Sequence, residues 1–570
     1  MLMEETVYDP LERFKNEYAE LFLQNAKNAF EELCQASQID KKANQDLCLE
    51  IFNLTNEKDS YETSRSHWKW LRIFCWIAIC GLLTVWGFTE DNLPGIICTI
   101  IAVGIGIFIF VYLNGVIREL DEVIENLESN IAEKKDAAYK IMQPLNELFG
   151  WDIPAQIIHQ TVPKLEFDPF FTRERLMELQ NEFQYDNSLN ENSSILFAHS
   201  GQINGNPFVI ANSKTYEMGT ETYTGHLTIY WSDWTIGANG KRQRVRRSQI
   251  LTATVTKPCP RYGKVGFVIY GNEAAPKLEF TRRPSKLVEE SFMQNFRRKR
   301  KLKELKKFSQ NLKDDSQYTL MSNHEFETLF ETKDRTDEVE YRLLFTALAQ
   351  QQMLSLIKDK TVSYGDDFTF FKQKKINVIF PEHLTAANLD TNPAQFVDYD
   401  FNHCRQNFMQ INQEYFRAVY FAMAPLLAIP LYQQMRSRKT IYRDVDKNKS
   451  SSWEWESIAN YMGEEKFKPA KCATDCILKT ELVSDDENGD SEIAVTAYGF
   501  QGIPQTDYVN VFGGDGRFHA VPVHWILYTP INKTTQIRIS ENVKEKGESH
   551  KIAAGEIYRR GIFCKKTRKL

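Results

Sequence analysis

Two long apolar runs dominate the hydrophobic pattern of the chain and lie next to each other near the N-terminus. They cover residues 73–88 and 93–116, and only four residues separate them. The second run holds no charged side chain and, at ~1.5 Å per residue, spans about 36 Å as a helix, enough for a hydrocarbon core of about 30 Å. The first helix is expected to start near Trp68, because indole rings favour the headgroup level. The pattern predicts a transmembrane hairpin over 67–117, with helices at about 68–88 and 93–116.

The charges that flank the hairpin predict its orientation. Basic side chains lie at both outer ends of the hairpin, whereas the connecting turn offers only Glu90 and Asp91. The flanking basic residues are Arg65, His67, Lys69, Arg72 and Arg118. Since cytoplasmic flanks carry the excess of Lys and Arg, we expect a multi-pass protein of the bacterial inner membrane with both termini in the cytoplasm. Two buried helices of a soluble core are the alternative, which charge-free runs of this length disfavour.

Apolar residues with heptad spacing continue from the second run into a predicted stalk. The seam begins with Ile117, Leu120, Ile124, Leu127 and Ile131 and ends at Leu148. This 3-4 spacing, with Glu and Lys around it, is typical of a coiled coil, here over 118–150. Segment 1–66 reads as a cytoplasmic helical segment, so both helical segments emerge on the same side of the membrane. The stalk is either an antiparallel pair within one chain or a seam between chains of a homo-oligomer.

The rest of the chain alternates between strand and helix patterns. Short strands separated by Gly, Asn and Pro indicate a cytoplasmic α+β domain over 151–400, whose first part, 151–170, holds three prolines and is interpreted as a linker. A helical segment follows at 401–450, and its apolar stretch 418–432 favours a core helix over a membrane-surface contact. Strands return in a β-rich module over 451–570. The predicted fold is a membrane-anchored α+β protein with a two-helix transmembrane hairpin, a helical coiled-coil stalk, a cytoplasmic α+β domain and a C-terminal β-rich module.

Composition indicates a reducing cellular compartment and changes little else in the interpretation. The chain has 570 residues, of which 26% are charged, and a net charge of −6, a balance that points to no particular partner. A chain of this length is expected to hold several folded units. The ten cysteines are scattered without a paired framework, as expected for reduced thiols in a cytosol.

One short string resembles a catalytic metal site. Tyr364-Gly365-Asp366-Asp367 matches the turn of RNA-dependent polymerases, in which adjacent carboxylates hold two Mg²⁺ ions. A polymerase also needs a further Asp on a neighbouring motif, which we do not find in the sequence. Gly-Asp-Asp between two strands is also typical of an ordinary hairpin turn, and that interpretation is preferred.

The remaining candidate motifs are weaker. Cys472 and Cys476 are four residues apart and could share a metal with His519 or His524. Zinc sites usually show tighter cysteine spacing and two clear pairs, so buried thiols are the preferred interpretation. The glycine-rich run 513–516 lacks the Lys-Ser/Thr of a phosphate loop and is interpreted as a turn. The sequence holds no protease, hydrolase or kinase motif either. We therefore assign no catalytic, cofactor-binding or metal-binding residue, and we expect no cofactor.

Two dense clusters of basic residues are the candidate binding features. One lies at 241–247, in an expected loop, and the other lies on a predicted helix over 286–313 with only Glu304 against it. The helical cluster comprises Arg297, Arg298, Lys299, Arg300, Lys301, Lys303, Lys306 and Lys307. Near an anionic leaflet each cation contributes on the order of 1 kcal/mol, so we take contact with anionic lipid headgroups as the hypothesis. A merely solvated helix face is the alternative. Nucleic acid is not expected, because aromatic residues that stack bases are sparse here.

One stretch resembles a known family. It reads HEFETLFETKDRTDEVEYRLLFTALAQQQMLSLI and is followed by VSYGDDFTFFKQKKINVIF. It is similar to the C-terminal half of a bacterial domain of unknown function, whose members also begin with two adjacent transmembrane helices. The matching features include Phe326 before a charged turn and Glu340 and Arg342 ahead of a Leu-Leu pair. The resemblance covers about residues 60–385, the chain departs from it by extra strands around 248–284, and it implies architecture without an activity.

These observations favour a membrane-tethered cytoplasmic binding or scaffold protein whose partner the sequence does not identify. The expected partners are the lipid bilayer, anionic lipid headgroups and a second copy of the chain through the coiled coil. The alternative is an unrecognised membrane-bound enzyme whose active site is assembled from distant residues in 190–400. A channel or transporter component is a third class, which the lack of charged residues at mid-depth of the two apolar runs disfavours.

Overall fold

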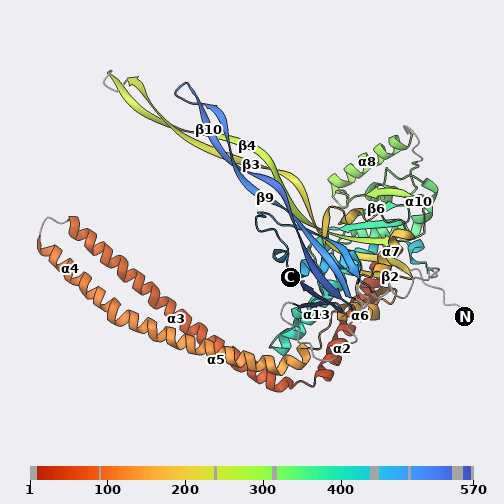
Figure 1. The fold of residues 1–570 in the computed structure, drawn as a ribbon, viewed down its shortest axis with the longest axis horizontal. Helices are drawn as coiled ribbons and strands as arrows, with labels where there is room; N and C mark the ends of the chain where they lie inside the picture. The colour runs from red at the N-terminus through yellow and green to blue at the C-terminus, as the bar shows by residue number, and fades with distance from the viewer. Residues whose placement is uncertain are drawn as a thin grey trace. The chain divides into compact units, whose positions relative to one another are not determined.

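A computed structural model describes most of the chain, and the described residues form two compact units. They are residues 9–88, 92–236, 241–289, 291–310, 318–434, 436, 449–485, 490–541 and 556–566. The first unit comprises 1–25, 151–391 and 412–570, and the second comprises 26–150 and 392–411. Figure 1 shows the helices and strands of both units in order along the chain.

The second unit is a long helical hairpin. Its main helices are α3 (Lys41–Phe88), α4 (Asn92–Ile107) and α5 (Asn114–Asn146), and the π-helical segment Phe108–Leu113 joins α4 to α5. Parts of α2 (Ala19–Ser37) and of α13 (Phe401–Leu427) complete the unit. Of the predicted four-residue turn of the hairpin, 89–92, residues 89–91 lie outside the described residues, and Asn92 begins α4.

Helices α3 and α5 pack side by side in opposite directions. Three ion pairs join them, and the residue numbers rise along α3 as they fall along α5. They are Lys134–Glu50 at 2.7 Å, Lys58–Glu128 at 3.5 Å and Arg65–Asp121 at 3.1 Å. The seam residues Ile117, Ile124, Leu127 and Ile131 are buried, as the heptad spacing predicts, whereas Leu148 is exposed. The seam is therefore an antiparallel pair within one chain.

One helical stretch of this unit has the length and composition of a membrane span. Among the described residues, Ile96–Asn146 is long and apolar enough to cross a bilayer, and only 17% of its most apolar window is buried. A core helix of a soluble protein would be mostly buried. The described part of the first predicted span, in α3, opens with Lys69 and Arg72 among tryptophans. It does not meet the same test, so the two-helix transmembrane hairpin stays a prediction.

The first unit contains two antiparallel sheets covered by short helices, which confirms the α+β class. The seven-stranded sheet has the order β1-β2-β3-β4-β7-β6-β5, and the five-stranded sheet has the order β11-β12-β10-β9-β8. The strands of the first sheet are β1 (Leu165–Phe167), β2 (Ser193–Ile203), β3 (Asn206–Ile236), β4 (Arg242–Gly271), β5 (Glu279–Arg282), β6 (Phe368–Gln373) and β7 (Ile376–Pro381). Those of the second are β8 (Ile477–Asp485), β9 (Asp490–Phe512), β10 (Phe518–Ser540), β11 (Glu556–Arg559) and β12 (Ile562–Lys566).

The helices of this unit are mostly short, and several begin with a side-chain cap. They are α1 (Pro10–Arg13), α6 (Ile153–Thr161), α7 (Arg173–Asn181), α8 (Phe292–Gln310), α9 (His324–Phe330), α10 (Glu338–Leu344), α11 (Ala347–Lys358), α12 (Glu382–Ala386) and α14 (Ser452–Met462). In α10, for example, the Asp337 carboxylate accepts a hydrogen bond from the Glu340 amide, which satisfies a free donor of the first turn.

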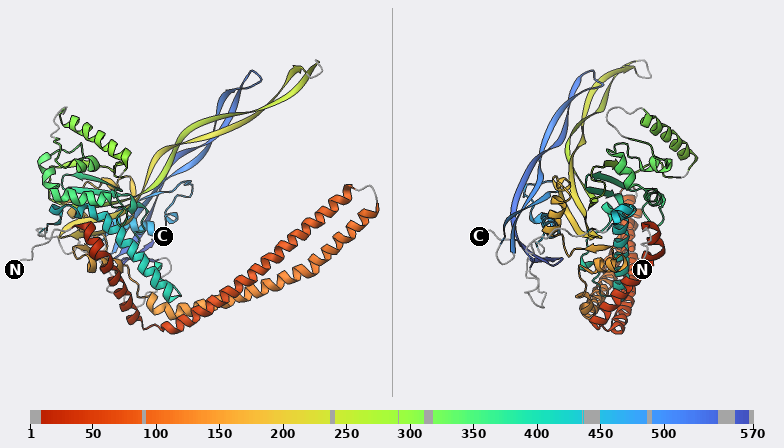
Figure 2. Two further views of the ribbon diagram at one scale, coloured as in Figure 1. Left: turned by 180° about the vertical axis from the view of Figure 1, so that it is seen from behind. Right: turned by 90° about the vertical axis from the view of Figure 1, so that its right-hand side faces the viewer.

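Two pairs of strands extend far beyond their sheets as two-stranded ribbons. Strands β3 and β4 stay paired from Phe208↔Tyr270 to Ile236↔Arg242, whereas β2 covers β3 only as far as Thr215. The remaining 216–236 run for about 70 Å at ~3.3 Å per residue. Strands β9 and β10 form a second ribbon, and all views show the two ribbons side by side (Figures 1 and 2).

Several short strands expected from the sequence are therefore parts of the two long strands β3 and β4. The loop expected at 241–247 is wrong, because residues 242–247 belong to β4. Glycines and prolines inside β3 and β4 suggest, from the sequence alone, that the strands end there. In the structure, Gly225 instead marks a close approach, because a Cβ atom there would lie 2.0 Å from the Pro522 carbonyl oxygen of the second ribbon.

Residues 151–170 are not a linker. They form α6 and β1, and β1 pairs with β2. Two of the three prolines that suggested a linker lie at the ends of the helix, because Pro154 is in the first turn of α6 and Pro163 follows its last residue. These prolines therefore mark the limits of a helix and not an irregular segment.

The core of the first unit joins parts of the chain far apart in sequence. The Trp453 ring of α14 packs edge-on against Phe171 at 5.7 Å and Phe267 at 6.0 Å. Segments of the predicted α+β domain and of the predicted β-rich module thus share one hydrophobic cluster. The apolar stretch 418–432 lies mostly within α13, and its residues 418–429 are buried, which confirms that it is a core helix.

Candidate functional site

Helix α8 carries the denser of the two basic clusters and docks on its neighbours by one face. The Arg298 guanidinium donates to two carbonyl oxygens of the preceding loop, at 2.7 Å each. The Lys301 ammonium lies 2.9 Å from the Glu331 carboxylate, and Leu305 is fully buried. Positions i, i+3 and i+7 share one side of a helix, so Arg298, Lys301 and Leu305 form the docking face.

The other side of α8 combines cations with apolar side chains. Six of the eight predicted contact residues are exposed there, and among the described residues none of the six forms an ion pair. They are Arg297, Lys299, Arg300, Lys303, Lys306 and Lys307. Phe292, Met293 and Phe296 are exposed as well, and Phe292 keeps 91% of its surface in solvent. We call these nine residues the outward face of α8.

The helical period explains why the three apolar residues share a side with the cations. Phe292, Phe296 and Lys303 are separated by four and seven residues, so they follow one stripe along the helix. The prediction of a lipid contact from the sequence included the eight cations but not this apolar stripe. The spacing of Phe292 and Phe296 was the available signal, since two aromatic residues one turn apart next to cations are typical of a helix at a membrane surface.

The acidic residue of the helical cluster forms its ion pairs with Lys333 and Lys301, off the outward face, and interacts with that face only through the charge of Arg300. The Glu304 carboxylate lies 2.8 Å from the Lys333 ammonium and 3.8 Å from that of Lys301. The hydrogen bond from Lys333 is the main reason that the pKa of Glu304 is lowered, so this carboxylate stays ionised and paired on the docking side. The positive charge of the outward face therefore remains available to an outside anion.

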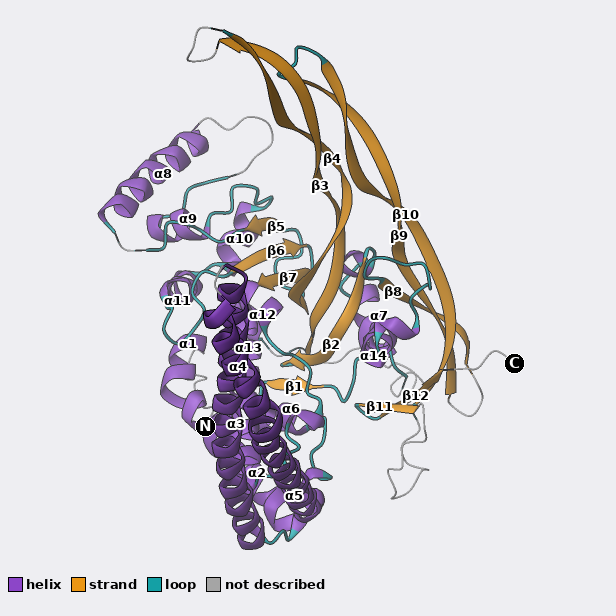
Figure 3. Ribbon diagram, turned by 90° about the vertical axis from the view of Figure 1, so that its left-hand side faces the viewer, coloured by secondary structure: helices purple, strands orange, loops and turns teal. Residues whose placement is uncertain are grey.

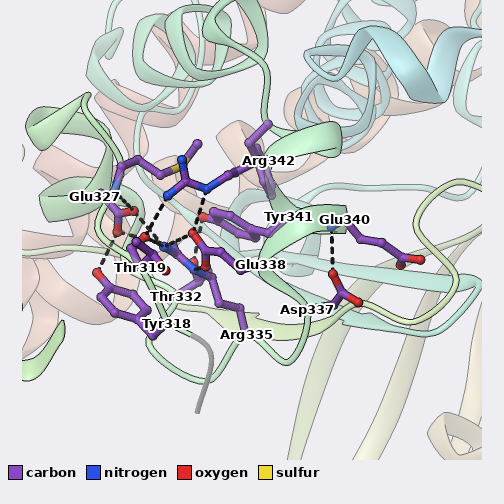
Figure 4. A network of polar contacts seen from close by, with 12 residues as sticks. Tyr318, Thr319, Glu327, Thr332, Arg335, Asp337, Glu338, Glu340, Tyr341 and Arg342 are labelled. Carbon is purple, nitrogen blue, oxygen red and sulfur yellow. Dashed lines mark hydrogen bonds and ion pairs between the residues drawn. The ribbon is translucent and has the colours of Figure 1, made fainter. Parts of the chain in front are cut away.

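A buried ionic network supports the platform on which α8 rests. The Arg335 guanidinium is fully buried, 3.0 Å from Glu327 and 2.7 Å from Glu338. It lies between the rings of Tyr318 and Tyr341, at 4.2 and 4.1 Å from their centroids, and the Tyr318 hydroxyl donates to Glu327 at 2.9 Å (Figure 4). With both carboxylates bonded to the guanidinium, this network acts as a structural support.

The second basic cluster lies on the long ribbon. Arg242, Arg244, Arg246 and Arg247 belong to β4, near the end of the β3–β4 ribbon. Arg247 lies 3.6 Å from Asp233 on the opposite strand, an exposed pair. The structure therefore presents these arginines on a paired, two-stranded element.

The carboxylates of the Tyr364-Gly365-Asp366-Asp367 string are bound to an arginine and a histidine of the protein itself. Asp366 forms an ion pair with the fully buried Arg282 and accepts a hydrogen bond from the Ser285 amide at 2.6 Å. Asp367 bonds to the His383 imidazole, whose other nitrogen lies 3.0 Å from the Ala418 carbonyl oxygen. The preferred hairpin turn between two strands is wrong, because the string lies in the loop between α11 and β6, and no strand precedes it there. Its carboxylates are bound by Arg282 and His383 and do not share a site open to metal ions.

The four candidate zinc ligands are not brought together. The Cys472 and Cys476 sulfurs are 3.5 Å apart, next to the start of β8. The first residue of β8 pairs with Tyr498 of β9, and Tyr498 pairs with Asn532 of β10. Asn532 is 13 residues from His519 on the same strand, so the cysteines and His519 are separated by ~43 Å along the sheet. The His519 imidazole instead pairs with Asp515 at 3.0 Å. Within the described residues no group of three or more His, Cys, Asp or Glu could hold a metal ion.

Two cavities bear on the alternative of an enzyme. The first, of about 450 Å³, is lined mainly by apolar residues of β6, β7 and the segment 184–189. Its acid, Asp186, has a pKa lowered by hydrogen bonds from Ser188 and is therefore ionised. The second, of about 530 Å³, holds Glu182 and Arg436, which form an ion pair with each other. Neither cavity gathers the several acids or histidines with perturbed pKa values that acid–base chemistry requires.

Comparisons with known proteins give no further guide to this site. No protein-family model, curated protein or solved structure matches the chain. The resemblance of about residues 60–385 to a bacterial family of unknown function therefore stays a prediction.

Proposed function

We propose that this chain is a membrane-tethered binding or scaffold protein whose soluble part contacts anionic lipid headgroups through the outward face of α8. The observation that carries this proposal is the division of α8 into a docked side and an exposed side. The exposed side holds six cations without an ion pair among the described residues, together with three exposed apolar side chains.

The chemistry of a lipid headgroup layer suits this face. Each cation close to an anionic leaflet contributes on the order of 1 kcal/mol, and aromatic side chains gain further free energy by entering the apolar boundary. The exposed apolar window of Ile96–Asn146 supports the tether. We further propose the finer arrangement predicted from the sequence: a two-helix transmembrane hairpin in a bacterial inner membrane, with both termini cytoplasmic.

The proposal is tested with the full chain held in nanodiscs of neutral phosphatidylcholine. These are mixed with sucrose-loaded vesicles, which sediment while nanodiscs stay in solution. We expect co-sedimentation with vesicles that contain anionic phosphatidylserine and much less with neutral vesicles. The binding should weaken from low salt to about 0.5 M salt, because the attraction is screened over about 8 Å already at physiological ionic strength.

Charge variants separate the outward face from the remaining cations. The α8-neutral variant carries Arg297→Gln, Arg300→Gln, Lys303→Gln and Lys307→Gln. The matched control removes four exposed cations of the second unit, by Lys27→Gln, Lys42→Gln, Lys140→Gln and Arg405→Gln. We expect the α8-neutral variant to lose most anionic-vesicle binding and the control to keep it. Equal loss in both variants, or equal binding to neutral and anionic vesicles by the unaltered chain, would contradict the proposal.

A further inference from the structure

The two ribbons pack face to face and form a protrusion, which we call the finger. It comprises 216–236 and 242–262 of the first ribbon and 499–512 and 518–531 of the second (Figure 3). Their inner faces share an apolar cluster that includes Ile229, Leu251 and Val523. The Lys257 ammonium of the first ribbon also lies 2.6 Å from Asp507 and 4.2 Å from the Trp525 ring of the second. The finger is thus a defined two-layer element.

The first ribbon extends past the end of the second. The Gly514 amide, in the turn of the second ribbon, donates to the Gln249 side chain at 2.7 Å, so this turn lies level with Gln249. The pairs from Ser232↔Arg246 to Ile236↔Arg242 continue beyond this point, for about 16 Å at ~3.3 Å per residue. This overhang forms the tip of the finger.

The outer face of the tip combines apolar residues on one strand with arginines on the other. Directly paired residues lie on the same face of an antiparallel ribbon. Ile236 pairs with Arg242 and Trp234 pairs with Arg244, so all four share one face. Trp234 is 66% exposed and Ile236 is 72% exposed, whereas Ile229, on the inner face, is only 8% exposed. Tyr230, Arg246 and Ile250 extend the same outer face.

The second ribbon also presents aromatic residues, on the opposite outer face. Phe512 pairs with Phe518 at the end of this ribbon, and their ring centroids are 5.2 Å apart. Both rings are exposed, as is that of Tyr508 on the same face. Val509 and Val511, between them in sequence, pack inward against the first ribbon. Aromatic residues therefore point away from the finger on both of its outer faces.

We infer that the end of the finger is a second lipid-contact site, which enters the headgroup region of an anionic membrane. A fluid interface surrounds an inserted tip and covers both outer faces at once. A nucleic acid lying along the arginines of the tip would cover one face of the finger and leave Phe512 and Phe518, on the opposite outer face, in water. Indole and phenol rings favour the headgroup level, and the arginines match lipid phosphates. This inference concerns a different element from α8 and does not depend on it.

The test uses the full chain in neutral nanodiscs, with the α8-neutral substitutions as background, so that binding through α8 is removed. We expect residual binding to sucrose-loaded phosphatidylserine vesicles. Adding Arg242→Gln, Arg244→Gln and Arg246→Gln should weaken this residual vesicle binding at least about tenfold, since each of the three lost cations contributes a similar share of the attraction to anionic lipid. Trp234→Ser with Ile236→Ser should weaken it as well. The matched control, Thr235→Ser with Gln243→Asn, changes the opposite face of the same overhang and should bind as the background does.

A second readout reports on insertion directly. Vesicles with nitroxide-labelled lipid tails should quench part of the tryptophan fluorescence of the background protein, and Trp234→Phe should remove that part. The inference is overturned if the background does not bind anionic vesicles, if the tip variants bind them as the control does, or if Trp234→Phe leaves the quenching unchanged. It is also overturned if the tip substitutions abolish binding of labelled single-stranded RNA but leave vesicle binding intact. Loss of all vesicle binding in the α8-neutral background would leave the proposal for α8 standing and refute this one.

Discussion

At the scale of single residues, Arg335 shows how the soluble part places a charge in its core. Its guanidinium has no exposed surface, and two carboxylates and two aromatic rings surround it. An ion pair of this kind adds little stability compared with an apolar core. Removing one partner is costly, however, because the remaining charges stay buried without compensation. Arg335 therefore fixes the packing of α9 and α10 more than it adds to the total stability.

We predict that Arg335→Met destabilises the first unit by about 3–5 kcal/mol, because it leaves Glu327 buried without its cation and Glu338 with the half-exposed Arg342 alone. The matched control is Arg342→Met. Arg342 also contacts Glu338, at 3.1 Å (Figure 4), but its side chain is half exposed, so its loss should cost at most about 1 kcal/mol. Thermal unfolding followed by near-ultraviolet circular dichroism measures both. Equal shifts of the melting temperature in the two variants would show that the burial of Arg335 does not increase the cost of losing its charge.

Lys372 provides a second residue-scale prediction, in which pH is the variable. Its ammonium is buried and donates to the carbonyl oxygens of Ala274 at 3.1 Å and Lys374 at 2.5 Å. Burial lowers the pKa of Lys372 from 10.5 to about 7. Between these two values the unfolded chain binds the proton more tightly than the folded chain, so stability should rise with pH, by on the order of a few kcal/mol.

The measurement is the difference in unfolding free energy between the unaltered chain and Lys372→Met, taken from pH 7 to pH 9. The difference cancels the other titrating groups that the two proteins share. We expect the unaltered chain to gain stability relative to Lys372→Met across this window. A constant difference would mean that Lys372 keeps its ordinary pKa in the folded protein.

At the scale of elements, the sequence was a good guide to helices and a poor one to the length of strands. The heptad spacing identified Ile117, Ile124 and Ile131 as buried, because the period of a helix fixes one side whatever lies around it. Alternation identified strands in 193–284 but not where they end. A glycine such as Gly225 suggests the end of a strand when only the sequence is known. Its presence inside β3 is explained by the close approach of the second ribbon, which lies far along the chain. The stripe of Phe292 and Phe296 was readable from their spacing, whereas the docking of Arg298 and Lys301 depends on carbonyl and carboxylate groups outside the helix.

Gly225 gives the prediction at this scale. Gly225→Ala places a methyl group against the Pro522 carbonyl oxygen and should force the two ribbons apart, at a cost of about 1–3 kcal/mol. Gly263→Ala, on the paired strand of the same ribbon, is the control, because a Cβ atom there meets nothing closer than the Thr215 hydroxyl at 3.9 Å. Hydrogen exchange of 518–531 should quicken in Gly225→Ala and stay unchanged in Gly263→Ala. Unchanged exchange in both would mean that the ribbons do not pack closely at Gly225.

At the scale of the whole molecule, the membrane-span candidate and the basic surfaces lie in different units. The helical hairpin holds the membrane-span candidate, and the sheet-containing unit holds both basic surfaces, α8 and the finger. Neither surface can act on a membrane unless the first unit lies on the side of the bilayer where the anionic lipid is. The orientation of the hairpin is therefore the condition on which the proposed contacts with the protein's own membrane depend.

The flanking charges lead to a direct prediction of that orientation. In a bacterial host, a reporter enzyme that is active only outside the cytoplasmic membrane should be silent when fused after Leu570 and active when inserted between Asp91 and Asn92. A fluorescent reporter that folds only in the cytoplasm should give the reciprocal pattern and serves as the control for expression. The basic residues at both outer ends of the predicted hairpin, with only Glu90 and Asp91 as charges between the two apolar runs, are the physical reason, because cytoplasmic flanks retain Lys and Arg. The reverse pattern would place α8 and the finger outside the cytoplasm. A cytoplasmic signal at both sites would mean that the apolar runs do not cross the membrane as a hairpin, and the tether would then rest on Ile96–Asn146 alone.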